Sequence, residues 1–216
     1  MKYSIIIPTM WYHVNQLCAM LAIYNSMDIV GEILIINNDD TKTPELNFSK
    51  VRLIGSGKNI YVNKAWKLGV EESKFDNAVL VNDDITIKGD LNLLFENISY
   101  MLREGVIVGV GANCYSKKNV VFKIKLRKRS IENRTEMGYG FGVFMFINKD
   151  TFLNTPIPDN ILVWYGDHIL YYKNTAWSFE GVQIRTAMRG TTSKIDLRGF
   201  ALKEKRAFFK YLSENK

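Results

Sequence analysis

The stretch NAVLVNDDITI, residues 77 to 87, places Asn82, Asp83 and Asp84 between two apolar, β-branched runs. Such runs are typical of buried strands. Two adjacent carboxylates at a strand end repel each other and lose hydration unless solvent, a partner or a cation compensates them. Two interpretations are open at this point: an ordinary turn built from Asn and Asp side chains, or a site that holds a metal ion.

Apolar strands alternate with helical patterns through the first half of the chain. Strands are predicted at 3–8, 31–37, 51–56 and 78–82, with helices from 14 to about 27 and from 62 onward. In the first helix, Val14, Leu17, Cys18 and Leu21 follow the i, i+3, i+4, i+7 spacing of an amphipathic helix. This order predicts an α/β fold with a mostly parallel central sheet that is flanked by helices.

The second half is less regular. Helices are predicted at 90–102, in the later part of 161–172 and at 201–212, and strands at 106–112, 141–148 and 178–188. Residues 120–134 begin with alternation and become a basic, mobile segment. We find no repeat or linker in the 216 residues, which predicts a single domain. We divide it into a nucleotide-binding half (1–88), an acceptor and catalytic half (89–199) and a basic C-terminal helix (200–216).

Polar clusters follow three of the predicted strands. Pro8 and Thr9 follow the first strand, Asn-Asn-Asp-Asp (37–40) the second, and Asn-Asp-Asp (82–84) the fourth. In open α/β sheets, ligands bind beyond the carboxyl ends of the strands. The three clusters are therefore expected to converge on one crevice, which favours a binding site over an ordinary turn at 82–84.

The order of these motifs resembles the GT-A nucleotide-sugar glycosyltransferases, specifically the family 2-like group. The resemblance covers about residues 3–175 and rests on SIIIPT, ILIINNDDT, NIYVNKAWKLGV, AVLVNDDITI and WYGDHIL. The chain departs from the usual pattern in five places. Residues 37–40 begin with Asn where the family usually has an acidic residue, and MRGTTSK (188–194) lacks the histidine that is often an extra metal ligand, for which His168 and Arg189 are the candidate substitutes. The other three departures lie in single motifs. Its acidic motif begins with Asn82, NIYVN (59–63) lacks the usual glycine, and Gly166-Asp167-His168 has one carboxylate where many relatives have two.

The resemblance implies a metal-dependent glycosyltransferase with a single GT-A domain, which moves a sugar from a nucleotide-sugar, expected to be a UDP-sugar, to an acceptor hydroxyl. It implies Mn²⁺ or Mg²⁺, with Asp84 as the direct ligand and Asp83 and His168 as further candidates. Asp167 is the candidate general base, and its alternative role is a helix cap. The implied donor-binding residues are Pro8, Thr9, Asn37, Asn38, Asp39, Asn59, Asn63, Asn82 and Asp83; turn formation and helix capping are the alternatives for the Asn and Asp residues.

The net charge of +7 and a pI near 9.3 favour contact with an anionic partner. The candidate acceptor-binding residues are Trp164, Tyr165, Lys125, Arg127, Lys128 and Arg129. One coherent acceptor is a hydroxymethylated base in double-stranded DNA, as in some phage glycosyltransferases, with the base flipped out of the stack. Other interpretations are a cell-surface glycan or lipid-linked sugar as acceptor, a non-catalytic nucleic-acid-binding module, or simply a solvated basic face. A nucleotidyltransferase is disfavoured because no Gly-rich phosphate loop lies near the N-terminus.

No apolar stretch approaches the roughly 18 residues that a membrane helix needs. Cys18 and Cys114 are the only cysteines, and they lie far apart without metal-binding or redox spacing. These features predict a protein of the reducing cytoplasm without a transmembrane segment.

Overall fold

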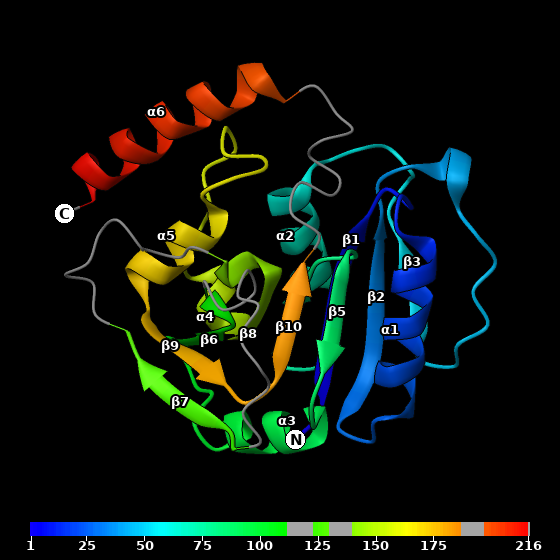
Figure 1. Cartoon of the computed structure of the whole chain (residues 1–216). Coiled ribbons are helices and arrows are strands. Elements are labelled where there is room, and N and C mark those ends of the chain that lie inside the picture. The colour runs from blue at the N-terminus through cyan, green and yellow to red at the C-terminus, as the bar shows by residue number, and fades with distance from the viewer. Residues whose placement is uncertain (112–122, 130–139, 187–196, 216) are drawn as a thin grey trace.

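A computed structural model of the chain describes residues 1–111, 123–129, 140–186 and 197–215 (Figure 1). The strands are β1 (Tyr3–Thr9), β2 (Val30–Asn37), β3 (Val51–Ile54), β4 (Asn77–Val81), β5 (Ile85–Lys88), β6 (Val106–Gly109), β7 (Lys125–Lys128), β8 (Phe144–Asn148), β9 (Thr175–Glu180) and β10 (Gln183–Thr186). The helices are α1 (Val14–Ser26), α2 (Val62–Glu72), α3 (Leu91–Ser99), α4 (Lys149–Leu153), α5 (Gly166–Lys173) and α6 (Arg198–Glu214), with short 3-10 turns η1 (Asp40–Lys42) and η3 (Phe141–Val143).

Eight strands form one sheet in the order β3-β2-β1-β4-β8-β6-β9-β7, and β5 pairs with β10 in a second, two-stranded sheet. Six of the eight strands run in one direction, whereas β8 and β7 run against their neighbours. The predicted α/β class with a mostly parallel central sheet flanked by helices is therefore confirmed.

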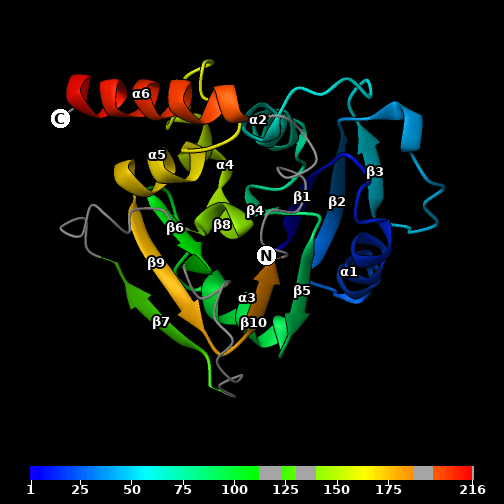
Figure 2. The same cartoon turned by 45° about the horizontal axis from the view of Figure 1, so that its top comes forward.

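Helices cover both faces of the large sheet (Figure 2). On β1, Ile5 and Ile7 point to the face that α1 and α3 cover, and Ile6 points to the face that α2, α5 and α6 cover. This alternation follows from the two-residue period of a strand. A strand that is buried on both faces is apolar throughout, which explains the run of three isoleucines after Ser4.

Three segments differ from the sequence prediction. Residues 125–128 form the edge strand β7 instead of a mobile segment, because they pair antiparallel with β9. The parts of the predicted segment at 120–122 and 130–134 lie outside the described residues. The predicted strand 178–188 is divided between β9 and β10, and β10 pairs antiparallel with β5 in the second sheet; residues 187–188 lie outside the described residues. The apolar run 141–148 begins as a 3-10 turn, and only Phe144–Asn148 forms a strand.

The parallel pairing places the polar clusters side by side. Thr9 at the end of β1 lies opposite Asn37 at the end of β2, and β4, which ends just before Asn82, pairs with β1 on the other side. None of the helices that the structure describes is long and apolar enough to cross a membrane.

Candidate active site

A pocket opens at the carboxyl ends of β1, β2 and β4. Its lining residues are Pro8, Thr9, Met10, Asn38, Asn59, Tyr61, Val62, Asp83, Val163 and Leu197. Five of the predicted donor-binding residues thus lie in this one pocket. They come from three strand ends and from the loop before α2, so the sheet topology brings together side chains that are up to about 75 residues apart.

Hydrogen bonds join these strand ends to one another. The Thr9 hydroxyl donates to Asp83 Oδ2 at 2.6 Å and accepts the Trp11 backbone N–H at 2.9 Å. The Asn38 backbone N–H donates to the Thr9 carbonyl at 3.0 Å, and Asn38 Oδ1 accepts the Ile60 N–H at 3.3 Å. The pocket wall is therefore held by its own polar residues.

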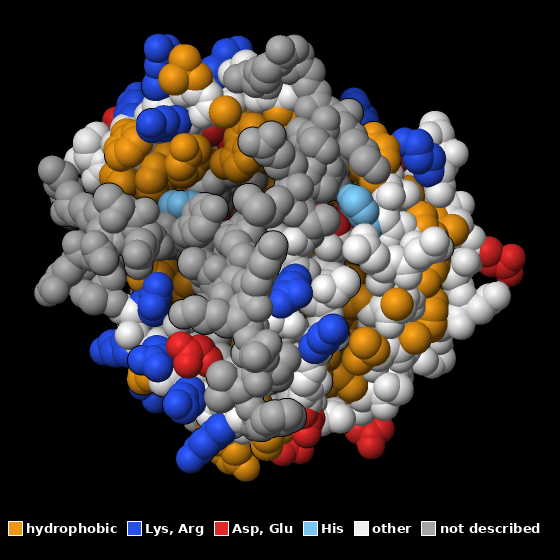
Figure 3. Space-filling model, viewed as in Figure 1, with side chains coloured by type: hydrophobic (Ala, Val, Ile, Leu, Met, Phe, Trp, Pro, Cys, Tyr) orange, Lys and Arg blue, Asp and Glu red, His pale blue; other side chains and the backbone are white. Residues whose placement is uncertain are grey.

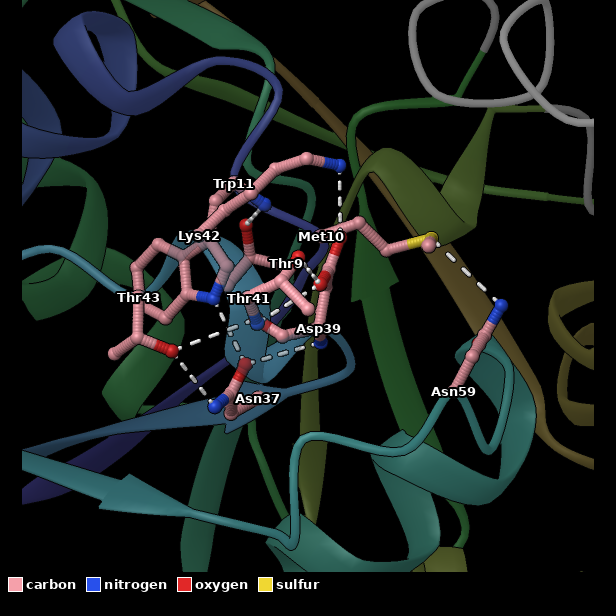
Figure 4. A network of polar contacts seen from close by, with 9 residues as sticks. All are labelled: Thr9, Met10, Trp11, Asn37, Asp39, Thr41, Lys42, Thr43 and Asn59. Atoms are coloured by element: carbon pink, nitrogen blue, oxygen red, sulfur yellow. Dashed lines mark hydrogen bonds and ion pairs between the residues drawn. The ribbon is translucent and has the colours of Figure 1, made fainter.

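Two predicted donor-binding residues hold the loop after β2 (Figure 4). Asn37 Oδ1 accepts the Trp11 indole N–H at 2.8 Å, and Asn37 Nδ2 donates to the Thr43 hydroxyl at 3.0 Å. Asp39 accepts from Thr41 and forms an ion pair with Lys42 at 2.8 Å. The hydrogen bonds from Lys42 and Thr41 lower the pKa of Asp39. Both side chains thus have local partners outside the lining of the pocket.

Asp83 and Asp84 are each only 6% exposed, and they face different partners. Asp83 accepts from Thr9, whereas Asp84 Oδ1 accepts the Thr186 hydroxyl of β10 at 2.9 Å. Burial, with a smaller contribution from the neighbouring charge of Asp84, raises the pKa of Asp83 to about 6, against the Thr9 hydrogen bond. Burial also raises the pKa of Asp84. The site therefore concentrates negative charge in a desolvated place.

These two carboxylates fit a divalent cation that shares its coordination with a substrate. Among the described residues, no three His, Cys, Asp or Glu side chains are grouped to enclose a metal ion, and neither Asp83 nor Asp84 forms an ion pair. Mg²⁺ and ions like it are commonly held by one or two carboxylates, with substrate phosphates and waters as the other ligands. The donor set suits that kind of site, and it does not suit a closed structural metal centre.

Asp167, the predicted base, is the second residue of α5 and adjoins the Asn-Asp-Asp motif through η3. Its Oδ2 accepts the Gly142 N–H at 3.1 Å, and the carbonyl of the next residue, Val143, accepts the Asn82 N–H at 3.1 Å. Gly142 is required here, because a Cβ at this position would lie 2.8 Å from the Trp66 ring. Asn82 and Asp167, which are 85 residues apart in the sequence, thus form hydrogen bonds with two consecutive residues of η3.

His168 lies against the same carboxylate. Its Nδ1 is 2.9 Å from Asp167 Oδ1, and the two side chains are 25% and 17% exposed, respectively. Burial lowers the pKa of His168, but the charge and hydrogen bond of Asp167 outweigh it, so the pKa lies above its usual value. The His168 imidazole is therefore hydrogen-bonded to the carboxylate of the candidate base.

The segment 161–165 lies between the side chains of Asn63 and Glu204, and the sequence predicted neither contact. Asn63, which is predicted to bind the donor, donates its Nδ2 to the carbonyls of Ile161 and Trp164 at 2.9 and 3.3 Å. Glu204 of α6 is 1% exposed and accepts the N–H groups of residues 162, 163 and 164. Glu204 was missed because its only signal is one acid among the lysines and arginine of 203–206.

Three aromatic residues beside the site have left-handed backbone conformations. Trp11, Tyr61 and Tyr165 have φ values of 61°, 65° and 64°, and they are the non-glycine residues with positive φ in the described part of the chain. Each such residue costs on the order of 1–3 kcal/mol, and such strain is concentrated at functional sites. Tyr165, a predicted acceptor contact, is stacked on Phe208 with ring centroids 4.8 Å apart, and Trp164 is half-buried.

The other predicted acceptor-binding residues lie away from the pocket. Lys125, Arg127 and Lys128 are exposed on β7, Arg127 pairs with Glu180 at 2.9 Å, and Arg129 follows the strand. Three strands separate β4 from β7, which corresponds to about 19 Å. Figure 3 shows basic side chains at the lower left, where Figure 1 places β7, and along the upper edge over α6. Arg189, a candidate substitute for the missing histidine ligand, lies outside the described residues.

Comparison with solved structures identifies the architecture. A crystal structure of residues 1–349 of TarS from S. aureus, a GT-A-like glycosyltransferase, superposes with a TM-score of 0.56 at 12% identity, over 94% of this chain and 65% of that chain. A longer TarS structure matches with a TM-score of 0.58, also at 12% identity, over 94% of this chain and 39% of that one.

The chain has a GT-A-like fold. It spans less than two thirds of the length of either TarS chain that it matches. No protein-family model and no curated protein sequence matches it. The likeness therefore concerns the fold, and the chemistry must be argued from the side chains of this chain.

Proposed function

We propose that this chain is a glycosyltransferase that binds a nucleotide-sugar in the pocket at the ends of β1, β2 and β4. The observation that carries the proposal is the convergence of Thr9, Asn38, Asn59 and Asp83 on one pocket, in a GT-A-like fold. Asp167 lies next to the Asn-Asp-Asp motif through η3. Nucleotide, cation and base sites would then be contiguous.

Asp83 and Asp84 would hold Mn²⁺ or Mg²⁺ together with the donor diphosphate. Such a cation offsets the charge that develops on the departing phosphate oxygens. Asn38 lines the pocket where the base of the nucleotide is expected. Its amide both donates and accepts hydrogen bonds, which matches the edge of uracil and supports a UDP-sugar as donor.

Asp167 would act as the general base in a direct displacement. The acceptor hydroxyl oxygen forms a bond to the anomeric carbon, the bond from that carbon to the diphosphate oxygen breaks with its electron pair, and the hydroxyl proton passes to the Asp167 carboxylate. The Gly142 N–H and the His168 side chain fix the orientation of this carboxylate. Its 17% exposure leaves it within reach of an acceptor.

Replacement of Asp167 tests the assignment of the base. Asp167→Asn preserves the shape of the side chain but removes its basicity, so transfer is expected to fall about 100-fold or more while donor binding is retained. Asp159→Asn, the same change at an exposed position, serves as the control. Wild-type turnover in Asp167→Asn would remove Asp167 from this role.

For the acceptor, we propose a hydroxymethylated base in double-stranded DNA. The support is the net charge of +7, the exposed lysines and arginine of β7, and the basic residues Lys203, Lys205, Arg206 and Lys210 on α6. Contacts to phosphates release counterions, so the affinity for DNA must fall steeply with salt.

A gel shift over a salt series, followed by mass analysis of the treated DNA, tests the acceptor. A steep salt dependence and a mass gain of one sugar are expected. Weak binding that does not depend on salt would contradict DNA as the acceptor and would favour a glycan or lipid-linked sugar. Binding to DNA without turnover of any donor would instead favour a non-catalytic module.

A further inference from the structure

We infer that Glu204 of α6 is a positioning residue for the candidate base, because it holds the segment that leads into Asp167. This inference rests on the proposed function for its catalytic consequence. Its structural part, a backbone segment clamped by a side chain from the C-terminal helix, rests on the contacts alone.

The Glu204 carboxylate accepts four short hydrogen-bond contacts from three consecutive backbone N–H groups. Oε1 is 3.0 Å from the Leu162 nitrogen and 3.1 Å from that of Val163, and Oε2 is 3.2 Å from the Val163 nitrogen and 2.7 Å from that of Trp164. Hydrogen bonds to an ionised group are about twice as strong as neutral ones. A buried carboxylate is tolerated when such donors satisfy it, so Glu204 and the segment depend on each other.

Asn63 of α2 holds the opposite set of groups in the same segment. It donates to the carbonyls of Ile161 and Trp164, while its own backbone N–H donates to the Leu162 carbonyl at 3.0 Å. Residues 161–165 belong to no helix or strand. The side chains of Glu204 and Asn63, together with the Asn63 backbone N–H, therefore satisfy these backbone groups in place of regular secondary structure.

The clamped segment contributes to both parts of the site. Val163 lines the donor pocket, and Trp164 and the strained Tyr165 lead directly into α5, which carries Asp167. The rest of α6 reinforces the attachment: Leu197 lines the pocket just before the helix, Phe200 packs on Tyr61, and Phe208 stacks on Tyr165. A displacement of about 1 Å at a catalytic group is enough to cost on the order of 100-fold in rate.

The test compares Glu204→Gln with Glu214→Gln, the same change at an exposed position on the same helix. Both oxygens of Glu204 accept N–H groups, so the amide of a glutamine must turn its NH₂ group toward at least one of them. Hydrogen–deuterium exchange of the full chain is expected to become about 10- to 100-fold faster at the amides of 162–164 in Glu204→Gln. The amides of β1 serve as the internal reference for global unfolding.

Kinetics on the donor identified for the wild type complete the test. Glu204→Gln is expected to lower kcat at least about tenfold, with a smaller rise in the KM for the donor, since Glu204 holds Val163 of the pocket whereas Asn38, Asn59 and Asp83 are held by other elements. Glu204→Asp keeps the charge on a side chain one methylene shorter, and it is expected to restore part of kcat. Glu214→Gln is expected to match the wild type in both measurements. If Glu204→Gln unfolds, Glu204→Asp takes its place in both.

The outcomes separate this inference from the proposed function. Unchanged exchange at 162–164 would overturn the clamp, whether or not the protein turns over any donor. Faster exchange together with a kcat equal to that of Glu214→Gln would overturn the positioning role. A wild-type protein that turns over no donor would overturn the proposed function, and the exchange measurement would still decide the clamp.

Discussion

At the scale of single residues, the Asn-Asp-Asp motif carries a cost in stability, because it buries ionisable side chains. Asp83 is buried beside a second carboxylate, and the Thr9 hydroxyl offsets only part of the cost of ionising it. A pKa raised above its usual value means that protonation of Asp83 stabilises the fold. This stabilisation is complete below about pH 3.8 and is lost as the pH rises through about 6.

Asp83→Asn tests this cost directly. Asparagine does not ionise, so the free energy of unfolding of the variant relative to the wild type is expected to increase between pH 4 and pH 8, by up to about 3 kcal/mol. Urea unfolding in EDTA at both pH values measures the change. Asp76→Asn, at an exposed position, provides the control. An equal difference between variant and wild type at the two pH values would show that Asp83 is not desolvated as described.

The His168–Asp167 pair has its own pH dependence. The pKa of His168 is raised by Asp167 against the effect of burial. The pair therefore contributes stability that is fully present below about pH 6.5 and is lost as the pH rises through the raised value. The loss of stability in His168→Asn is expected to be larger at pH 5.5 than at pH 9, and Asp167→Asn should abolish that difference. Unfolding curves of the wild type, the two single variants and the double variant at the two pH values would reveal a pH-independent loss if the pairing is wrong.

At the scale of elements, the strands and helices of the first half follow from the sequence because each shows one clear pattern, a continuous apolar run for a buried strand or the 3.6-residue period for a helix. The apolar runs at 3–8, 31–37 and 78–82 form buried strands, and the polar residues after them meet at one edge. Strand direction is a different matter. Phe144–Asn148 is as apolar as a buried parallel strand, yet it runs antiparallel between β4 and β6. Its direction could not be predicted, because a strand buried on both faces has the same apolar pattern in either direction.

The packing of α2 on the sheet depends on Gly69. A Cβ at this position would lie 2.4 Å from Ile6 Cγ2 and 3.3 Å from Ile36 Cδ1, whereas a Cβ at Gly199 of α6 would meet nothing within 4 Å. Gly69→Ala is therefore expected to destabilise the protein by about 1–3 kcal/mol through overpacking. Gly199→Ala is expected to stabilise it by about 0.5–1 kcal/mol through helix propensity. Denaturant unfolding measures the free energy of unfolding of both variants. Changes of the same sign in the two variants would contradict this description of the interface between α2 and the sheet.

At the scale of the whole molecule, the pocket was predictable and its far wall was not. Strand-end residues such as Thr9 and Asp83 are placed by topology, which the order of strands along the sequence determines. Val163, Leu197 and Glu204 reach the site through packing of α6 on a segment without regular structure. No periodicity marks such contacts, so a carboxylate in a basic helix resembles a surface residue until the fold is known.

Donor binding at this pocket is tested by a thermal-shift screen of nucleotide-sugars with and without Mn²⁺, on the wild type and on Asp84→Asn. For a ligand at about 100 times its Kd, the wild type is expected to gain roughly 5–10 °C in Tm. At least one donor, expected to be a UDP-sugar, should stabilise the wild type in a way that requires Mn²⁺, and Asp84→Asn should lose the Mn²⁺-dependent part. No shift with any nucleotide-sugar would contradict the central claim that this pocket is a donor site.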